Sequence, residues 1–460
     1  MKLTVLEKLF SENPSLDDII RDTIDKRKNE DAFYVCDVND ILRKHKTWLL
    51  KLPRVRPFYA VKCNSSPIVL EILASLGIGF DCASKTEIDT MLDLGVAPDD
   101  IIYANPCKTK SYISHAASMG IDYMTFDNEL ELYKIRQMHP NSKMVIRIRV
   151  DDSHSVCRLG LKFGADMARV PFLLQVAKKI GVNVVGCSFH VGSGCESVEA
   201  YKSALANAKF VFELGQKMGF NMNLLDIGGG FPGTSNAAIS FDETASAINE
   251  ALELHFPEYD ADGCKSKVQI IAEPGRYYVA SAFTLVTNII AKRIVPLEDG
   301  SNTLASMYYL NDGVYGSFNC TIFDHWKVTP VPFPMHGDFN ARQCRLSTIW
   351  GPTCDSMDCI IQNVVLPEMN IGEWIIFREM GAYTMAAGST FNGFKMPSMK
   401  YYLPSYTTEV LQTLKNWSRI YRLVEEAHNE DSVEEDDSLL ETFIDDDHAV
   451  VVDNYIHVHC

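Results

Sequence analysis

The chain has 460 residues, 47% of them hydrophobic, and a formal net charge of −17. This length allows two or three domains with a large core. Thirteen acidic residues lie between Glu425 and Asp453, and no Lys or Arg follows Arg422, so the C-terminal tail carries −13 and the rest only −4. Because the net charge before the tail is so close to zero, this part of the chain is not expected to bind nucleic acid or a membrane surface.

The N-terminus and the cysteines point to a cytoplasmic protein. Residues 1–10 place charges among the apolar positions, unlike a signal peptide, and no apolar run reaches membrane-spanning length. The thirteen cysteines show neither CxxC nor Cys/His ligand spacing. Reduced thiols fit this pattern better than a disulfide framework or a metal site.

The first part of the chain predicts an α/β fold. A strand over Asp31–Asp37 and a helix over Asp40–Leu50 precede eight strand-like segments that alternate with amphipathic helices. The segments are Pro57–Lys62, Ile78–Ser84, Ile101–Asn105, Tyr123–Asp127, Met144–Val150, Val184–Val191, Leu224–Gly230 and Val268–Gly275. This pattern predicts a (β/α)8 TIM-type barrel over residues 38–276, with a doubly wound sheet as the alternative.

After residue 276 the pattern changes to longer strands with little helix. The expected strands are Tyr278–Val295, Ser306–Phe323, Arg345–Ile349, Glu373–Phe377 and Met399–Leu403. They predict a separate all-β domain over residues 277–423, which residues 1–37 are expected to join. The acidic, low-complexity residues 424–460 predict a disordered tail.

Lys62 ends the first apolar strand of the predicted barrel. A lysine at the tip of a buried strand is costly unless its amine is used, and partial desolvation would lower its pKa, as a Schiff-base amine needs. A lysine that merely extends to solvent is the alternative. In such a barrel the chemistry lies where the strands end. The other ends carry Asp81, Asn105, Asp127, Arg147, His190, Gly228, Gly229, Gly230, Glu273 and Arg276.

A phosphate-bearing cofactor fits these strand ends. The three glycines 228–230 can present backbone N–H groups to a phosphate, and the loops after strands seven and eight of a barrel often bind one. Arg276 ends the eighth strand. Together with Lys62 this predicts pyridoxal 5'-phosphate. Glu273 would keep its pyridine nitrogen protonated, or would instead pair with Arg276.

His190 and Cys354 each leave two interpretations open. His190 could stack on a planar ring, with the Ser193 hydroxyl near a phosphate, or be structural. Cys354 precedes Asp355 in the motif Trp350-Gly-Pro-Thr-Cys-Asp. It could be an exposed reactive thiol or a small buried apolar side chain.

Several motifs together closely resemble the eukaryotic ornithine decarboxylase family, which belongs to the barrel-type pyridoxal-phosphate decarboxylases. They include Pro57-Phe-Tyr-Ala-Val-Lys-Cys-Asn, Ser188-Phe-His-Val-Gly-Ser-Gly, Leu225-Asp-Ile-Gly-Gly-Gly-Phe-Pro-Gly, Ala272-Glu-Pro-Gly-Arg-Tyr-Tyr, Trp350-Gly-Pro-Thr-Cys-Asp and Met380-Gly-Ala-Tyr-Thr. The resemblance covers residues 30 to 405.

The resemblance implies a role for each residue around the cofactor. Lys62 would form the Schiff base, Glu273 would hold the pyridinium and His190 would stack on the ring. The phosphate would be held by Ser193, Gly228, Gly229, Gly230, Arg276 and Tyr383. Lys62 and the cofactor would be supported by Asp81, Glu87 and Arg147.

The resemblance also implies a homodimer with shared active sites. Cys354 and Asp355 would reach the barrel of the second chain, where Cys354 controls protonation of the product carbanion. Asp324 and Asp355 would bind the distal ammonium of ornithine. The remaining dimer contacts would be made by Lys162 with Asp358, as an ion pair, and by Gly381.

The expected activity is decarboxylation of L-ornithine to putrescine, a step of polyamine biosynthesis. Phe323 stands where the family usually has tyrosine, which leaves a neutral aliphatic amino acid such as leucine as an alternative substrate. A non-catalytic antizyme inhibitor is the second alternative. Such proteins lose cofactor-binding and proton-donor residues, whereas Lys62, His190 and Cys354 are all present in this chain. Antizyme would bind through residues 108–136. The tail, residues 424–460, does not resemble the degradation signal of the vertebrate enzymes.

Overall fold

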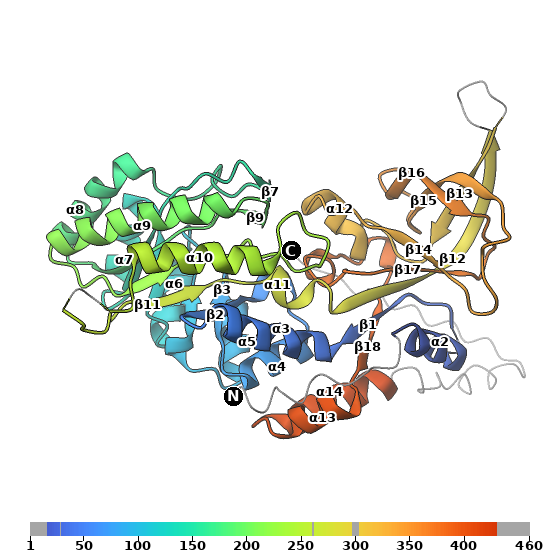
Figure 1. Cartoon of the computed structure of the whole chain (residues 1–460), viewed down its shortest axis with the longest axis horizontal. Coiled ribbons are helices and arrows are strands. Elements are labelled where there is room, and N and C mark those ends of the chain that lie inside the picture. The colour runs from blue at the N-terminus through green and yellow to red at the C-terminus, as the bar shows by residue number, and fades with distance from the viewer. Residues whose placement is uncertain (1–15, 28, 260–261, 297–302, 430–460) are drawn as a thin grey trace, which may run out of the picture.

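A computed structural model describes residues 16–27, 29–259, 262–296 and 303–429. The predictions for residues 1–15 and 430–460 lie outside this range. Within it, no helix is long and apolar enough to cross a membrane. The chain forms a barrel and a separate mixed sheet, which lie side by side (Figure 1).

Eight parallel strands close into the barrel, in the order β10-β11-β2-β3-β4-β5-β6-β8. They are β2 Val55–Ala60, β3 Gly79–Cys82, β4 Ile101–Tyr103, β5 Tyr123–Phe126, β6 Lys143–Arg147, β8 Asn183–Ser188, β10 Leu224–Asp226 and β11 Gln269–Ala272. Each strand falls within or overlaps one predicted segment, so the barrel is confirmed. The doubly wound alternative is wrong, because β11 pairs with β2 and closes the sheet.

Helices cover the outside of the barrel (Figure 1). They are α3 Val38–Lys51, α4 Pro67–Ser75, α5 Lys85–Asp93, α6 Lys110–Ser118, α7 Glu129–Met138, α8 Val170–Ile180, α9 Val198–Lys217 and α10 Phe241–His255. Ser84, Thr109 and Asn128 cap the N-termini of α5, α6 and α7 with their side chains. These caps satisfy backbone N–H groups and fix where each helix begins beside the strand ends.

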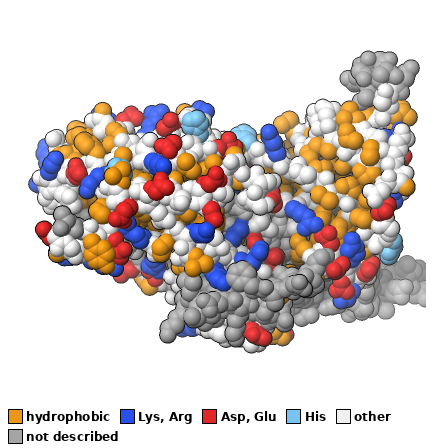
Figure 2. All heavy atoms as spheres, viewed as in Figure 1, with side chains coloured by type: hydrophobic (Ala, Val, Ile, Leu, Met, Phe, Trp, Pro, Cys, Tyr) orange, Lys and Arg blue, Asp and Glu red, His pale blue; other side chains and the backbone are white. Residues whose placement is uncertain are grey.

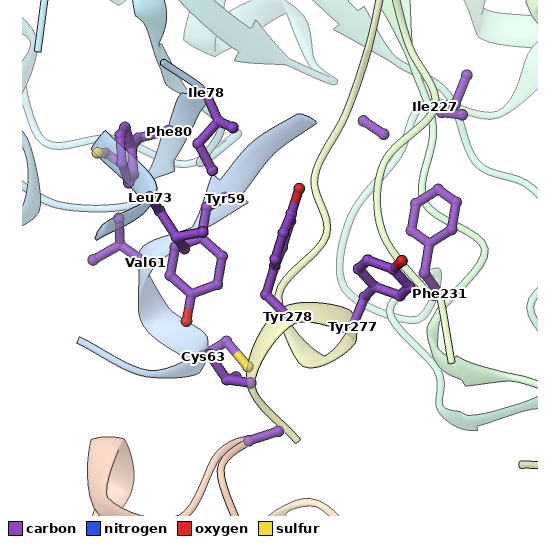
Figure 3. Packing of buried hydrophobic residues seen from close by; sticks show 14 of the residues in the cluster. Tyr59, Val61, Cys63, Leu73, Ile78, Phe80, Ile227, Phe231, Tyr277 and Tyr278 are labelled. Carbon is purple, nitrogen blue, oxygen red and sulfur yellow. The ribbon is translucent and has the colours of Figure 1, made fainter. Parts of the chain in front are cut away.

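Aromatic packing supports the short helical turn η1, Val61–Cys63, which carries Lys62 just beyond β2. Val61 and Cys63, on either side of Lys62, are buried. Beside this turn Tyr59 meets Tyr278 edge to face, at 6.2 Å between ring centroids (Figure 3). Burial of its two neighbours leaves Lys62 one direction in which to point, toward the open end of the barrel.

The second unit is a mixed sheet built from both ends of the described chain. Its strands are β12 Phe283–Pro296, β13 Leu304–Leu310, β14 Pro330–Phe333, β15 Cys344–Trp350, β16 Cys359–Pro367 and β17 Trp374–Phe377, joined by β1 Phe33–Asp37 and β18 Ser398–Tyr402. The early strand β1 pairs antiparallel with β12 and parallel with β18. The helix α2, Leu16–Lys26, contributes Ile20 to the apolar cluster on this sheet.

This β domain contains more helix than the sequence analysis expected. The additional helices are α11 Arg276–Val279, α12 Cys320–Phe323, α13 Ser405–Gln412 and α14 Trp417–Asn429. The predicted strand 306–323 is wrong beyond Leu310, because the buried Asp312 carboxylate accepts backbone hydrogen bonds from Gly313 and Ser317 and turns the chain. The predicted tail is wrong for residues 424–429, which continue α14.

The helix α14 packs against α4 and β18. Arg419 Nε lies 2.6 Å from Glu71 Oε1, and Asn416 Nδ2 donates to Glu71 Oε2 at 3.0 Å. Glu71 belongs to α4 and is buried. Since α4 follows the turn that carries Lys62, the C-terminal helix braces the barrel close to that turn.

Replacement of Arg419 by methionine should lower the free energy of unfolding by about 1–3 kcal/mol, because the buried Glu71 carboxylate would keep only Asn416 as a side-chain partner within the described part of the chain. Urea denaturation followed by circular dichroism measures the change. Arg422→Met, at an exposed position of the same helix, is the matched control. Equal stability of the two variants would contradict the brace.

Candidate active site

A cavity of about 580 Å³ opens at the carboxyl ends of the barrel strands. Side chains from both domains line it. From the barrel come Lys62, Arg147, Lys162, His190, Ser193, Gly229, Gly230, Glu273 and Arg276, and from the β domain come Phe323, Asp324 and Tyr383. The structure therefore brings most of the predicted site residues to one place.

Lys62 lines this cavity and lies against a carboxylate. Its Nζ donates to Asp81 Oδ2 at 2.5 Å, with the lysine side chain 45% exposed and that of Asp81 fully buried. Burial lowers the pKa of Lys62, but the charges of Asp81 and then Glu273 outweigh it and raise that pKa. The expectation of a lowered pKa is wrong here, because the strand pattern does not show that two acids face the amine.

Glu273 shares its surroundings with a second buried acid, Asp226. Burial, followed by the charge of Asp226, raises the pKa of Glu273 well above its usual value. Burial raises the pKa of Asp226 to about 7, although Gly228 N donates to its Oδ1 at 2.9 Å. Two buried carboxyl groups so close together do not both ionise readily near neutral pH. Glu273 can thus hold a proton inside the cavity.

Sequence reasoning gave Asp226 no role. Its signal was an aspartate at the end of the buried strand β10, two residues before the first of the three glycines. An acid at such a position is costly unless the fold uses it. The same reasoning that singled out Lys62 at the end of β2 would have found Asp226.

His190 presents a neutral imidazole to the cavity. Burial, followed by the positive charges of Arg147 and Lys62, lowers its pKa well below the usual value. Gly192 N donates to His190 Nδ1 at 3.0 Å, so the ring proton is on Nε2. A neutral planar ring on the cavity wall can stack on another planar ring.

The glycine loop lies close to other backbone segments. Gly228 has φ +62° and Gly230 has φ +101°. A Cβ atom at Gly228 would clash with the Phe189 carbonyl, and one at Gly230 would lie 2.7 Å from the Gly192 oxygen. Residues larger than glycine are therefore excluded at both positions, by the positive φ and by the lack of space. Because the loop carries no side chains, a ligand can approach its backbone N–H groups.

Arg276 and Ser193 form a polar corner beside this loop. Arg276 Nη2 donates to Ser193 Oγ at 2.9 Å, while its buried Nε has no hydrogen-bond partner among the described residues. The rings of Tyr383 and Trp326 lie 5.2 and 5.8 Å from the guanidinium carbon. A guanidinium with an unsatisfied donor, a hydroxyl and open backbone fit a phosphate group.

The other predicted barrel residues have supporting positions. The Arg147 guanidinium lies 5.4 Å from the Phe163 ring, and Lys162 Nζ lies 5.0 Å from the same ring. Glu87 Oε2 accepts from Ala83 N at 2.5 Å. This bond fixes the loop after β3, which carries Asp81.

Cys354 and Asp355 do not line the cavity of their own chain. Cys354 is exposed, and the Asp355 carboxylate accepts hydrogen bonds from the Tyr315 hydroxyl and from Met357 N. The structure therefore does not bring these two residues to Lys62 within one chain.

Asp358 and Gly381 are packed inside the chain. The buried Asp358 carboxylate accepts from Val314 N at 2.7 Å and Thr353 N at 2.9 Å. A Cβ atom on Gly381 would clash with the Val279 carbonyl. These contacts give both residues a structural role, and the contact with a second chain stays a prediction.

Residues 38–280 match the family model described as the pyridoxal-binding domain of pyridoxal-dependent decarboxylases. The chain belongs to the pyridoxal-dependent decarboxylases. Antizyme inhibitor 2 of Xenopus laevis is 50% identical over 417 residues, covering 89% of each chain. Ornithine decarboxylase of Rattus norvegicus is 49% identical over 423 residues, covering 90% of this chain and 89% of the rat protein.

Solved structures agree with this family. The arginine decarboxylase of Paramecium bursaria Chlorella virus is 35% identical and superposes with a TM-score of 0.78, over 84% of this chain and 100% of the viral chain. Pyridoxal phosphate fits the decarboxylase site described above. Lys62, the polar corner at Arg276 and Ser193, the neutral His190 and the protonated Glu273 supply the groups that its aldehyde, phosphate, ring face and nitrogen require.

The decarboxylase site should make stability depend on pH through Asp226. In the folded chain this residue keeps its proton up to about pH 7, whereas in the unfolded chain it loses it near pH 4. The unfolded state therefore binds fewer protons between these values, and stability falls as the pH rises through them. Asp226→Asn should lose less stability than the wild type between about pH 5 and pH 8.

Urea titrations at both pH values measure this difference. Asp99→Asn, at an exposed aspartate, should follow the wild type. A parallel pH dependence in wild type and Asp226→Asn would show that Asp226 is not the titrating group.

Proposed function

We propose that this chain is a catalytic decarboxylase that converts L-ornithine to putrescine and CO2. One observation carries the proposal, namely that Lys62 faces a cavity which also holds Glu273, His190 and Arg276. Frog antizyme inhibitor 2 and rat ornithine decarboxylase are almost equally identical to the chain, so overall identity does not separate the two functions. An assembled set of catalytic groups favours the enzyme.

Bound pyridoxal phosphate supplies an electron-accepting ring that stabilises the carbanion left when CO2 departs. The chain's own residues hold it. Lys62 Nζ would attach it covalently, Ser193 and Arg276 would hold its phosphate, and His190 would press against its ring. Glu273 would place a proton at the ring nitrogen, which makes the ring a better acceptor of electrons.

Two carboxylates favour a substrate with a distal ammonium. Asp324 lines the cavity and Asp355 would enter it from a second chain. Leucine brings no positive charge to either acid, whereas the distal ammonium of ornithine can form a charge-assisted hydrogen bond with each of them. Phe323 is 70% exposed and also lines the cavity. It lacks the hydroxyl group that a tyrosine at this position would offer to the substrate. That loss should cost about 1 kcal/mol and cannot reverse selection by charge.

CO2 release from a panel of amino acids, measured with purified protein and added pyridoxal phosphate, tests this choice. Ornithine should give a higher kcat/KM than leucine, and Phe323→Tyr should raise kcat/KM for ornithine several-fold, by about 1 kcal/mol. Lys62→Ala is the inactive control. A higher kcat/KM for leucine would make a neutral amino acid the substrate, and no release from any would favour an antizyme inhibitor.

The chain should work as a homodimer with shared sites. Cys354 and Asp355 lie outside the cavity of their own chain, among the exposed apolar side chains Met357, Phe391 and Phe394. Figure 2 shows further hydrophobic side chains gathered over the β domain. A two-fold contact would cover this surface and bring Cys354 to the second barrel, with Cys354 protonating the product carbanion. Lys162, Asp358 and Gly381 are the proposed supporting contacts.

A mixture of two inactive variants tests whether each active site is built from both chains of a dimer. Lys62→Ala and Cys354→Ala should each be nearly inactive alone. After random exchange half of the dimers are mixed, and each mixed dimer has one native site, so activity should return to about a quarter of wild type. Differently tagged chains that co-purify without any recovery would rule out sharing.

We further propose that the protein is cytoplasmic and binds antizyme. Free thiols such as Cys63, Cys187 and Cys320 fit a reducing compartment. Leu130 and Tyr133 are exposed on α7 within residues 108–136, and antizyme inhibitors are among the relatives. Co-migration with purified antizyme in gel filtration tests this binding, and separate elution would contradict it.

A further inference from the structure

The two charged groups assigned to cofactor and substrate contact each other. Arg276, the proposed phosphate ligand, begins α11 shortly after the last barrel strand β11, and Asp324, the proposed ammonium ligand, directly follows α12 of the β domain. Arg276 Nη2 lies 2.7 and 2.9 Å from the two carboxylate oxygens of Asp324. The side chains are 12% and 7% exposed, so solvent screens this pair only weakly.

Within the described part of the chain, the guanidinium has a donor free for a second anion, but it carries only one positive charge. Nη2 already serves both Ser193 and Asp324, while Nε has no partner among the described residues. A phosphate held by Ser193 and Arg276 must share the guanidinium with Asp324, because both anions require the same cation. Phosphate binding therefore weakens the hold of Arg276 on the carboxylate.

When phosphate is bound, less positive charge compensates the Asp324 carboxylate, so another cation beside it would be stabilised more strongly. Among the described residues the other side chain that bonds to its carboxylate is the Cys157 thiol, 3.7 Å from Oδ1, and a thiol brings no positive charge. A largely buried carboxylate without a countercharge is costly. The distal ammonium of a substrate can supply that charge.

We propose that the Arg276–Asp324 contact couples cofactor binding to substrate binding. Phosphate at Arg276 releases Asp324, which then binds a distal ammonium more tightly. By linkage, the ammonium strengthens phosphate binding by the same factor. The inference rests on the proposed function and adds to it a reciprocal coupling between the phosphate site and the ammonium site, carried by one ion pair.

Space at the pair allows such an exchange. Arg276 and Asp324 line the active-site cavity and also a second cavity of about 720 Å³. Their surroundings are thus accessible to small ions and are not closed by packing.

Isothermal titration calorimetry on the full-length chain, freed of cofactor, tests the coupling with inorganic phosphate and 1,4-diaminobutane as probes. Saturating phosphate should tighten diamine binding about tenfold, within the usual range of coupling between sites, and diamine should tighten phosphate binding equally. Diamine affinity that is independent of phosphate, or weakened by it, would overturn the proposal.

Asp324→Asn separates this mechanism from direct attraction between the two probes. Loss of the competing carboxylate should raise phosphate affinity about tenfold. Glu196→Gln removes an exposed acid from the second cavity and should change the phosphate affinity little. An unchanged affinity in Asp324→Asn, or an equal rise in both variants, would refute the competition. Ornithine turnover without coupling would leave the proposed function intact, whereas coupling without turnover would refute only the function.

Discussion

The contact between Lys62 and Asp81 places the strongest constraint on this chain. The amine faces the fully buried Asp81 and, beyond it, Glu273. Those acids belong to the neighbouring strand β3 and to the residue that follows β11, the two strands that pair with β2 in the closed barrel. An open sheet would leave β2 without one of these neighbours. Closure of the barrel is therefore what gives Lys62 its electrostatic surroundings.

The β domain holds the Lys62 turn from the other side. Tyr383 N donates to the Cys63 oxygen at 2.9 Å, and Asn64 Nδ2 donates to the Gly381 oxygen at 2.8 Å. The β-domain segment around Tyr383 is thus bonded directly to the turn. This attachment explains why Gly381 tolerates no Cβ, since the segment lies against Val279 at the start of the domain. The cavity is consequently a joint product of two domains within one chain.

The sequence predicted the eight barrel strands and most cavity residues, because alternating strands and helices force the strand ends to one face. It did not predict the raised pKa of Lys62 or the pairing of Arg276 with Asp324, because each depends on residues far apart in the chain. The helix α12 was missed because the nearby Asp312 carboxylate turns the chain through backbone hydrogen bonds that a strand pattern does not show. Residues 424–429 were missed because their helix α14 packs against the distant α4, and local composition does not show that contact.

The pairing of β1 has a consequence for how the protein is made. Phe33–Asp37 is among the first described segments to be synthesised, yet its parallel partner β18 ends only at Tyr402. The barrel strands lie between them, from Val55 to Ala272. On the ribosome the barrel strands are complete while β1 still lacks its late neighbour. Contacts this distant in sequence form slowly, so completion of the β-domain sheet depends on the synthesis of the last described part of the chain.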